Sequence, residues 1–600
     1  MFGQYVVLTW LVGVCIAQLP PKPEGVTVLK SKFHENVTIS YKEPKICETT
    51  PDVKSFAGYV HLPPHFLEDG DGESQDYPIN TFFWFFEARK NPSTAPLAIW
   101  LNGGPGGSSL MGLLEENGPC FIASDSKTTM PNPWSWNNEV NMLYIDQPNQ
   151  VGFSYDIPTN VTLRPTDFGL GWEPIPADFS NGIPTPNYTQ LVGTVSSQKL
   201  SQTANTTAFA AHALWHFVQT WFFEFPHYKP SDNRISLWSE SYGGHYSPGF
   251  FGFFQTQNEK ITNGTSTEKG AHKLHLDTLG IVNGLIDVLV QGEYDIHFGY
   301  NNTYGIQLFN ESYYHSLLDE WTRPGGCRSL IENCRSALRS PTPNTTSCAL
   351  LEPQCSEPLL GYILHESGRS YYDIAHPTAD PFPPPHFMGY LTHEHVLSAL
   401  GVPVNFSMVS LSVGQAFDSS FDYIVGGFLE SIAHLLENGV GVHLMYGDRD
   451  FACNWLGGEA ASLAVPWARQ DEFKEAGYEG LVVDGEVKGL TRQVGKFSFS
   501  RVFQAGHEVP AYQPEAAYEV FMRAMKGRDV ATGQRDAKGV VTGGRRDAWT
   551  RSEVPEWPGS KCYVLKTSTC KKDIWERVVK GEVEVRDWFV VDEEEEMRDL

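Results

Sequence analysis

The stretch that decides the fold of this chain is Ser239-Glu-Ser-Tyr-Gly-Gly-His-Tyr246. The residues before it, Arg234-Ile-Ser-Leu-Trp238, alternate apolar and less apolar side chains, which predicts a strand that feeds a sharp turn. The turn places Ser241 between the small residues Ser239 and Gly243, where the strand and helix backbones must approach closely around a strained serine. This is the pattern of a nucleophile elbow, with Ser239 where the first glycine is usual. Serine and glycine are common, so the same string without supporting context would more often be a surface loop.

Further strands and helices are predicted on both sides of this stretch. Residues 206–225 carry apolar side chains at three- and four-residue spacing, which predicts a helix leading into the strand before Ser241. Strand, helix and strand in this order favour a mainly parallel sheet with helices on both faces. Helices are also expected at 418–438 and 514–525. The predicted strands are residues 57–62, 80–86, 96–101, 140–146, 440–446 and 497–503.

The predicted domain organisation follows from where these patterns weaken. Residues 18–50 are expected to be a polar arm, and 156–200 a long surface excursion rich in Pro, Gly, Thr and Asn. Residues of about 255–395 are expected to be largely an insertion that caps the site. We predict one domain over residues 18–526 and a peripheral extension over 527–600.

The composition restricts the class of protein. With 600 residues, 41% of them hydrophobic, the chain can bury a large core. A net charge of −27 makes nucleic acid an unsuitable partner. Neither zinc-type ligand spacing nor a phosphate-binding loop is present, so no metal and no cofactor are predicted.

The N-terminus predicts export. An apolar run over residues 5–16, followed by the small residue Ala17, predicts a signal peptide of residues 1–17, although a basic segment before the run is missing. The run is short for a bilayer, and the acidic C-terminus is not a lipid-anchor signal, so no membrane anchor is expected. We predict a secreted protein, with a vacuolar or lysosomal-type compartment as the alternative. Nine sequons predict glycosylation at Asn36, Asn160, Asn187, Asn205, Asn263, Asn301, Asn310, Asn344 and Asn405.

The cysteines predict disulfides and one free thiol. Of the ten cysteines, Cys15 lies in the predicted signal peptide, and the odd remainder predicts an unpaired thiol, for which Cys453 is the candidate. The near-symmetric spacing of four cysteines suits Cys327–Cys355 outside Cys334–Cys348. Cys562–Cys570 would close a short loop, which leaves Cys47–Cys120. Other pairings remain open.

Serine chemistry needs two further groups. A serine hydroxyl becomes nucleophilic when a base removes its proton, and a carboxylate usually orients that base. Asp448 and Asp450 follow one predicted strand and His507 follows another, at the strand ends where such folds hold their sites. The chain order Ser, Asp, His is that of an α/β-hydrolase fold, which we therefore predict. A lone histidine after a glycine is more often structural, and its position at a strand end favours catalysis.

At this point a resemblance becomes specific. The chain resembles the serine carboxypeptidase family, most of all its secreted fungal members, over roughly residues 50–525. The motifs occur in the family's order. They are Trp100–Ser109 (Trp-Leu-Asn-Gly-Gly-Pro-Gly-Gly-Ser-Ser), Asn132–Asn137, Tyr144–Pro148, Glu240–His245, Gly447–Leu456 and Gly506–Pro510.

The resemblance implies a role for each site residue. Ser241 would be the nucleophile, Asp450 rather than Asp448 the orienting acid, and His507 the base. Gly104 and Tyr242 would supply the backbone N–H groups of the oxyanion hole. The substrate's C-terminal carboxylate would be bound by Asn102, the Gly103 N–H, Glu116 and Glu240. Without the resemblance, Glu116 would be interpreted as a surface acid.

The implied reaction releases the C-terminal amino acid of a peptide or protein through an acyl-enzyme on Ser241. Ionised Glu116 and Glu240 would repel a carboxylate, whereas protonated ones can donate hydrogen bonds to it, so activity is expected at acidic pH. Met111 and Glu508 would line the leaving-residue pocket, and Glu508 predicts acceptance of C-terminal Lys or Arg. Cys453 would lie near the triad, although a buried core cysteine is an equally compatible interpretation. Gly107 stands where relatives usually have a cysteine, so a disulfide made there is expected to be absent.

Two rival functions use the same observations. An acyltransferase would use the same triad and pass the acyl group to an alcohol or amine, but the Asn102, Glu116 and Glu240 set favours peptide termini. A non-catalytic binding or protective protein is disfavoured by an ordered Ser, Asp and His. Labelling by a fluorophosphonate would separate the second rival from an enzyme.

Overall fold

The computed structural model describes residues 19–68, 74–166, 172–229, 231–266, 268, 270–378, 382–557 and 559–591. The predicted signal peptide and the acidic residues from 592 onwards lie outside these ranges. Among the described residues, the helices are all too short or too polar to traverse a bilayer.

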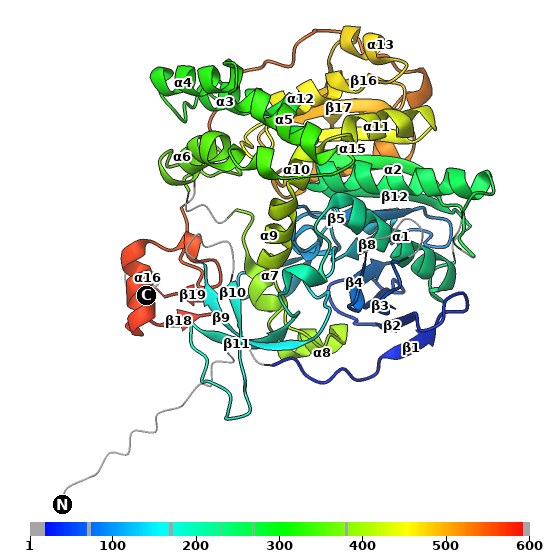
Figure 1. Ribbon diagram of the computed structural model, residues 1–600, viewed down its shortest axis with the longest axis vertical. Helices are drawn as coiled ribbons and strands as arrows, with labels where there is room; N and C mark the ends of the chain where they lie inside the picture. Colours follow the sequence, from blue (N-terminus) through cyan, green and yellow to red (C-terminus); the bar gives the residue numbers. More distant parts are fainter. Residues whose placement is uncertain are drawn as a thin grey trace, which may run out of the picture.

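A mixed twelve-stranded sheet runs through the molecule (Figure 1). Neighbouring strands are parallel from β8 to β17. The strands beyond them on either side are antiparallel. In spatial order the strands are β1 (Thr27–Lys30), β2 (Thr38–Lys42), β3 (Ser55–Leu62), β4 (Ile79–Phe86), β8 (Asn141–Ile145), β5 (Leu97–Leu101), β12 (Arg234–Glu240), β13 (His275–Val282), β14 (Gly441–Gly447), β17 (Phe497–Val502), β16 (Glu486–Val494) and β15 (Glu479–Val483).

Apolar residues on both faces of the central strands build two cores. In β5, Leu97, Ile99 and Leu101 belong to one core, and Ala98 and Trp100 belong to the other, as the alternation of a strand requires. The first core contains α1 (Thr207–Glu224), α2 (Gly243–Thr262) and α11 (Phe428–Glu437), and the second contains α15 (Pro514–Met525). Helices therefore cover both faces, which confirms the predicted α/β-hydrolase fold.

The insertion that caps the sheet begins later than predicted. Residues of about 255–395 were expected to form it, but α2 continues to Thr262 and β13 is a central strand inside this range. The sequence analysis did not predict β13, because the polar residues His275 and Asp277 interrupt its buried apolar residues. The chain leaves the sheet between β13 and β14. The α-helices there that precede α11 are α3 (Val288–Tyr300), α4 (Glu311–Thr322), α5 (Cys327–Leu338), α6 (Tyr362–His365), α7 (His386–Tyr390), α8 (Glu394–Leu400), α9 (Leu411–Ser420) and α10 (Asp422–Val425).

Two segments that were predicted to be irregular contain strands. The polar N-terminal arm forms β1 and β2, which extend the sheet beyond β3. The excursion over 156–200 forms a three-stranded sheet of β9 (Thr159–Pro165), β10 (Trp172–Pro176) and β11 (Leu191–Val195). Polar and proline-rich strands at a surface lack the apolar alternation on which the prediction relied.

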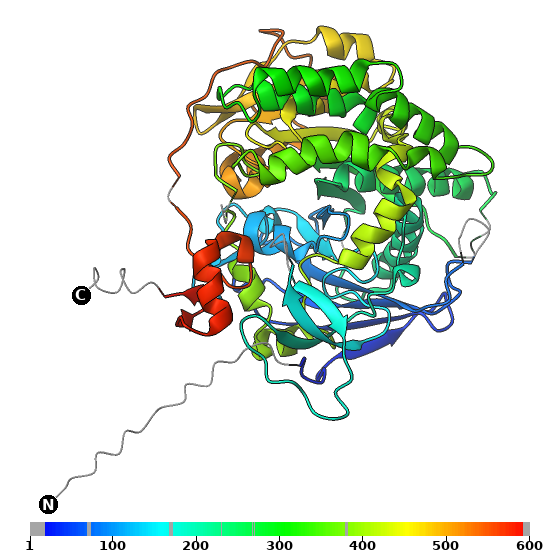
Figure 2. The same cartoon turned by 60° about the vertical axis from the view of Figure 1, so that its left-hand side comes forward.

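The C-terminal extension is not wholly peripheral. Residues 529–548 pack along the antiparallel edge of the sheet, where Val530 N donates to Gln493 Oε1 at 2.8 Å. Residues 562–591, which we call the C-terminal lobe, then lie beside β9, β10 and β11 (Figures 1 and 2). The lobe contains the Cys562–Cys570 disulfide, α16 (Lys572–Lys580), β18 (Val585–Arg586) and β19 (Phe589–Val590).

The structure also contains further short elements. They are β6 (Cys120–Ile122), β7 (Thr129–Pro131), α12 (Trp455–Ala464), α13 (Gln470–Glu475), α14 (Val509–Tyr512) and a π-helix over Gly112–Glu116.

Candidate active site

Four neighbouring parallel strands bring the candidate catalytic residues together. Ser241 follows β12, Asn283 follows β13, Asp450 comes three residues after β14, and His507 comes after β17. The carboxyl ends of parallel strands lie at the same edge of a sheet. Residues more than 260 positions apart in the sequence therefore converge at this edge.

Ser241 sits in a strained turn. Its φ is 63°, in the left-handed region that non-glycine residues rarely adopt. The Ser241 N–H donates to the Val282 carbonyl, and the Leu285 N–H donates to the Ser241 carbonyl, both at 3.0 Å. A Cβ on Gly244 would lie 2.4 Å from the Leu285 carbonyl oxygen, so the close approach of this loop requires glycine.

Ser239 stands where a glycine is usual, and its side chain forms hydrogen bonds. Its hydroxyl bonds to the Gly243 carbonyl at 2.9 Å and to Ser247 Oγ at 2.8 Å, and so ties the end of β12 to the first turn of α2. A Cβ on Gly243 would lie 2.5 Å from Ser239 Cβ. The departure from the usual elbow is therefore accommodated by small residues on both sides.

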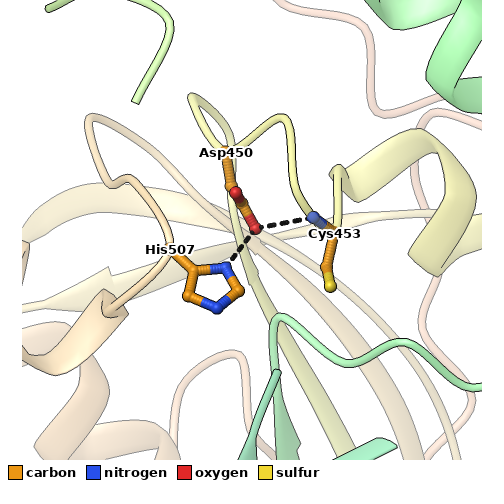
Figure 3. Close-up of side chains that lie close together, drawn as sticks. All are labelled: Asp450, Cys453 and His507. Atoms are coloured by element: carbon orange, nitrogen blue, oxygen red, sulfur yellow. Dashed lines mark hydrogen bonds and ion pairs between the residues drawn. The ribbon is translucent and has the colours of Figure 1, made fainter. Parts of the chain in front are cut away.

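His507 is held by Asp450 (Figure 3). The two side chains join at 2.7 Å through His507 Nδ1 and Asp450 Oδ2. The same oxygen accepts from Asn283 Nδ2 at 2.8 Å and from the Cys453 N–H at 3.1 Å. Burial alone would lower the pKa of His507, but the charge and hydrogen bond of Asp450, together with the charges of Glu508 and Glu116, outweigh burial, so this pKa is raised.

Asp448, the other acid in this loop, has different partners. It accepts from Arg501 Nη2 at 2.9 Å and from the Tyr304 hydroxyl at 2.6 Å, all within the interior. The described residues include no hydrogen bond between Ser241 Oγ and His507. Such bonds often tighten only when substrate binds.

Asp450, Cys453 and His507 also form a cluster whose side-chain atoms lie within 4.8 Å of one another. Metal binding would need a thiolate at Cys453. Burial, with the negative Asp450 beside it, instead raises the pKa of this thiol well above its usual value. The cluster therefore fits a hydrogen-bonded acid and base with a neutral, unpaired thiol beside them, and not a metal site.

The glycine-rich loop after β5 packs against the turn at Ser241. A Cβ on Gly103 would lie 2.4 Å from the Tyr242 nitrogen and 2.9 Å from Ser241 Cβ. Gly104 has a φ of +113°, and Gly107 N donates to the Gly103 carbonyl at 3.0 Å, so the loop turns sharply. The backbones of Gly103–Gly104 and Tyr242 thus adjoin the same serine.

Asn102, Glu116 and Glu240 form a buried polar cluster. The side-chain oxygen Asn102 Oδ1 accepts from Trp100 Nε1 at 2.7 Å and from the Gly112 N–H at 3.0 Å. This orientation directs Asn102 Nδ2 to Glu240 Oε1 at 3.3 Å and to Glu116 Oε1 at 3.5 Å. Apart from the other carboxyl, Oε2 of each glutamate has no partner among the described residues.

Both glutamates favour the protonated form. Glu116 is 1% exposed and Glu240 3% exposed. Burial, with the negative Glu508 nearby, raises the pKa of Glu116 to about 8. Burial and the charge of Glu116 raise the pKa of Glu240 well above its usual value. Neutral carboxyls can donate hydrogen bonds, so this cluster suits an anionic ligand.

The leaving-residue candidates are Met111 and Glu508. Met111 and Glu115 are the two half-buried residues of the segment 111–116, while the residues between them are buried. Glu508 directly precedes α14. Its charge raises the pKa of both Glu115 and Glu116, so these three acids share one region.

The sequence motifs did not reveal several residues that the structure brings into the site. Asn283 was not predicted because it follows β13, a strand that the sequence analysis did not predict. Glu115 was not predicted because only its neighbour Glu116 matches the family's motif. Asp422 in α10 accepts from the Tyr242 hydroxyl at 2.9 Å. No spacing rule connects Asp422 to position 242, so only the folded chain reveals this contact.

The predicted covalent features can be compared with the structure. The four disulfides of the structure join the predicted pairs, Cys47–Cys120, Cys327–Cys355, Cys334–Cys348 and Cys562–Cys570, and Cys453 is a buried free cysteine. Eight of the nine sequon asparagines are exposed. Asn405 is 7% exposed and its Oδ1 accepts from the Thr194 N–H at 2.8 Å, so a glycan on Asn405 would displace packed groups, and glycosylation there stays a prediction.

Comparison with known proteins gives a consistent result. The sequence model of a family described as Serine carboxypeptidase matches residues 44–527. Carboxypeptidase S1 homolog A of Arthroderma otae is 50% identical over 597 residues, which covers 96% of this chain and 91% of that protein. Carboxypeptidase S1 of Penicillium janthinellum is 33% identical over 491 residues, covering 82% of this chain and 99% of that protein.

A solved structure shares the fold. It is KEX1(DELTA)P, a prohormone-processing carboxypeptidase from Saccharomyces cerevisiae. The TM-score is 0.57 at 22% identity, and the match covers 80% of this chain and 94% of that chain.

Proposed function

The chain belongs to the serine carboxypeptidase family, and we propose how its own residues remove the C-terminal amino acid of a peptide. It is a serine-type carboxypeptidase, a hydrolase that acts on peptides. The observation that carries the proposed mechanism is the buried Asn102–Glu116–Glu240 cluster directly beside the serine turn.

Ser241 is the nucleophile and His507 the base. His507 Nε2 takes the proton from Ser241 Oγ as this oxygen attacks the carbonyl of the last peptide bond. Asp450 accepts the Nδ1 proton at 2.7 Å and stabilises the imidazolium that forms. His507 then protonates the leaving amino group, and water hydrolyses the acyl-enzyme in the same way.

The negative charge on the tetrahedral intermediate is stabilised by the backbone N–H groups of Gly104 and Tyr242. The close packing of the Gly103–Gly104 segment against the Tyr242 nitrogen supports this assignment. Such donors stabilise the transition state because they are already oriented before charge develops.

Glu116 and Glu240 bind the free C-terminal carboxylate, together with Asn102 and the Gly103 N–H. Protonated carboxyls donate hydrogen bonds to it, so affinity requires a pH below their pKa values. For Glu116 this value is about 8, so affinity falls as the pH rises through about 8. This requirement favours free C-termini over amidated ones.

His507 sets the acid limit. It must be neutral to act as a base, and its pKa is raised above 6.5, so kcat/KM falls as the pH drops below that raised value. The charge of Glu116 is one cause of the shift, so the protonation of Glu116 that carboxylate binding requires lowers this acid limit. We therefore propose that peptidase activity extends from about pH 8 down to the acidic side.

The leaving residue contacts Met111 and Glu508. The negative Glu508 is suited to a C-terminal Lys or Arg side chain. The sequons and the four disulfides support export to an oxidising compartment, with secretion as the proposed destination and a vacuolar or lysosomal-type compartment as the alternative.

The test combines labelling and product analysis. A fluorophosphonate should label Ser241 in the wild type, and Ser241→Ala should abolish both the label and the release of the last amino acid from blocked dipeptides at pH 5. The matched peptide amide should be hydrolysed far more slowly. Labelling without hydrolysis but with transfer to an added alcohol or amine would support an acyltransferase, and no labelling would support a binding protein.

A further inference from the structure

A turn of the cap, residues 369–377, which we call the cap loop, packs against the loops that follow β14 and β17. These two loops carry the candidate acid and the candidate base. The cap loop closes on itself, because the Ser370 N–H donates to the His376 carbonyl at 3.0 Å. Asp373, in the middle of it, is fully buried. The cap loop therefore inserts an acidic side chain into the interior beside the site.

Three backbone hydrogen bonds join the cap loop to the loops of the acid and the base. They run from the His507 N–H to the Tyr372 carbonyl at 3.0 Å, from the Ala452 N–H to the Tyr371 carbonyl at 3.1 Å, and from the Ile374 N–H to the Arg449 carbonyl at 2.9 Å. One donor is thus the base itself, and Arg449 directly precedes the acid Asp450. A displacement of the cap loop would therefore move both members of the pair.

The fit between the cap loop and the base is close. A Cβ on Gly506 would lie 2.6 Å from the Tyr372 carbonyl oxygen, so this approach requires glycine. The ring centroids of Tyr372 and His507 lie 4.9 Å apart. His507 is therefore held at Nδ1 by Asp450 and at its backbone by the cap loop.

A buried ion pair holds the cap loop in this position. Arg449 Nη2 lies 2.8 Å from Asp373 Oδ2, and His376 Nδ1 lies 3.4 Å from the same oxygen. Arg449 also reaches the loop that carries the base. Its Nη1 donates to Gln504 Oε1 at 3.2 Å, and its backbone N–H donates to the Ala505 carbonyl at 2.9 Å. One arginine thus connects the cap loop, the acid's loop and the base's loop.

The burial of this pair favours a geometric role. Arg449 is 4% exposed, and Asp373 is fully buried. An intact buried ion pair stabilises a fold little more than well-packed apolar residues of similar volume would. Removal of one partner, in contrast, leaves a buried charge uncompensated, so the pair strongly favours the one arrangement in which both charges meet. That arrangement is the one that places the cap loop on the acid and the base.

We propose that Asp373 is a positioning residue, whose ion pair with Arg449 holds the cap loop in place and so sets the geometry between the acid and the base of the reaction. This inference rests on the proposed function, in which Asp450 and His507 act on Ser241. Catalytic groups that are displaced by a fraction of an ångström lose much of their effect, so such a support acts on turnover.

Loss of the pair should affect turnover and the pH profile more than substrate affinity. The carboxylate-binding cluster belongs to the ends of β5 and β12 and to the π-helix, so KM should stay within about twofold of the wild-type value. Burial lowers the pKa of His507, and the charges of Asp450, Glu508 and Glu116 raise it. A looser contact with Asp450 should therefore lower this pKa and move the acid limb of kcat/KM to lower pH.

The experiment measures kcat, KM and the pH profile of Asp373→Asn and of Arg449→Gln with one blocked dipeptide. Each variant should lower kcat and the rate of fluorophosphonate labelling about tenfold. Asp373→Asn/Arg449→Gln leaves neither buried charge unpaired, so it should be more stable to heat than the single variants. Its kcat should be no lower than that of Arg449→Gln, because the two residues act through one contact.

The matched control is Asp529→Asn. Asp529 is also a fully buried aspartate beside an arginine, with its Oδ1 3.4 Å from Arg535 Nη2. It accepts from the Thr532 N–H at 2.8 Å and from the Arg535 N–H at 2.6 Å, within its own turn at the antiparallel edge of the sheet. Asp529→Asn should lose stability but keep the wild-type kcat and pH profile.

A wild-type kcat and pH profile in folded Asp373→Asn would overturn the proposal. If Asp373→Asn did not fold, a wild-type kcat in the double variant would overturn it instead. Losses that multiply in the double variant, or an equal loss of kcat in Asp529→Asn, would also contradict it. If the wild type hydrolysed no peptide but Asp373→Asn still slowed labelling of Ser241, the proposed reaction would fail and the positioning role would stand.

Discussion

Asn283 connects the acid of the candidate triad to the sheet. Its Nδ2 donates to Asp450 Oδ2 at 2.8 Å, and its Oδ1 accepts from the Gly447 N–H at 2.9 Å. It is fully buried and follows β13, the strand between those that carry Ser241 and Asp450. One side chain therefore sets the position of the carboxylate relative to β14.

We expect Asn283→Ala to lower kcat by about tenfold or more, because Asp450 loses a donor that orients it, an effect on the order of 1–2 kcal/mol. The change in KM should be small, since Asn283 does not contact the carboxylate cluster. Steady-state kinetics with one blocked dipeptide would measure this. Asn283→Asp retains the size but removes the donor, so near-wild-type activity in Asn283→Asp would contradict the interpretation.

Glu116 provides the clearest pH dependence. In the wild type, KM for a peptide should rise up to tenfold per pH unit above about 8, as Glu116 loses the proton with which it binds the carboxylate. Glu116→Gln keeps a hydrogen-bond donor at every pH and should flatten this rise, while KM at pH 5 changes little. KM measured from pH 4 to pH 9 tests this, with the peptide amide as the control.

A variant whose KM rises as steeply as that of the wild type would show that another group controls binding. A wild-type KM that is constant across this range would argue against protonated glutamates altogether.

At the level of elements, α10 of the cap supports the serine turn. Asp422 accepts from the Thr207 N–H at 3.0 Å and from the Thr207 hydroxyl at 2.5 Å, at the start of α1. It also accepts from the Tyr242 hydroxyl at 2.9 Å. In addition, Arg335 of the disulfide-bonded α5 donates to the Ile424 carbonyl at 2.8 Å, which anchors α10 itself.

Asp422→Ala should therefore reduce both stability and reactivity. Three donors lose a buried acceptor, so we expect a loss of roughly 2–4 kcal/mol in the free energy of unfolding. The rate of fluorophosphonate labelling at Ser241 should also fall, because Tyr242 is released. Urea unfolding and labelling kinetics measure the two effects. Asp418→Ala, which removes an exposed carboxylate of α9, serves as the comparison. An unchanged labelling rate would separate α10 from the serine turn.

Strands β16 and β15, at the antiparallel end of the sheet, were not predicted from the sequence, and the residues of β16 show why. Thr491, Arg492 and Gln493 of β16 are buried although they are polar. Their polar atoms bond to residues far along the chain, as when Arg492 Nη2 donates to the Arg546 carbonyl at 2.9 Å. A buried strand whose partners are distant carries no apolar signature in its own sequence.

At the level of the whole molecule, residues 528–550 complete the main domain. Arg501 of β17 is fully buried and donates to the Ala548 carbonyl at 2.5 Å and to Asp448 at 2.9 Å. A buried charge that loses part of its hydrogen bonding is strongly destabilising. The segment therefore belongs to the core, although it lies beyond the range that matches the family.

Two truncations should behave differently. A chain that ends after Lys526 uncovers the end of β16, where Val494 pairs with Val541, and removes an acceptor of Arg501, so we expect little soluble, protease-resistant protein. A chain that ends after Glu556 keeps these contacts and loses only the C-terminal lobe, so it should fold and react with a fluorophosphonate. Limited proteolysis and thermal unfolding measure both. Equal stability of the two chains would show that residues 528–550 are dispensable.

The sequence by itself determined the α/β-hydrolase fold, the order of Ser241, Asp450 and His507, and the family, because buried central strands and tight glycine turns allow few residue types and leave local patterns. Only the tertiary structure decided the start of the cap at residue 283, the partners of Asp450 and Asp448, the burial of Asn405 and the position of the C-terminal lobe. These depend on contacts between residues far apart in the chain. Such contacts are decided by which surfaces meet when the chain folds, and no local spacing records them.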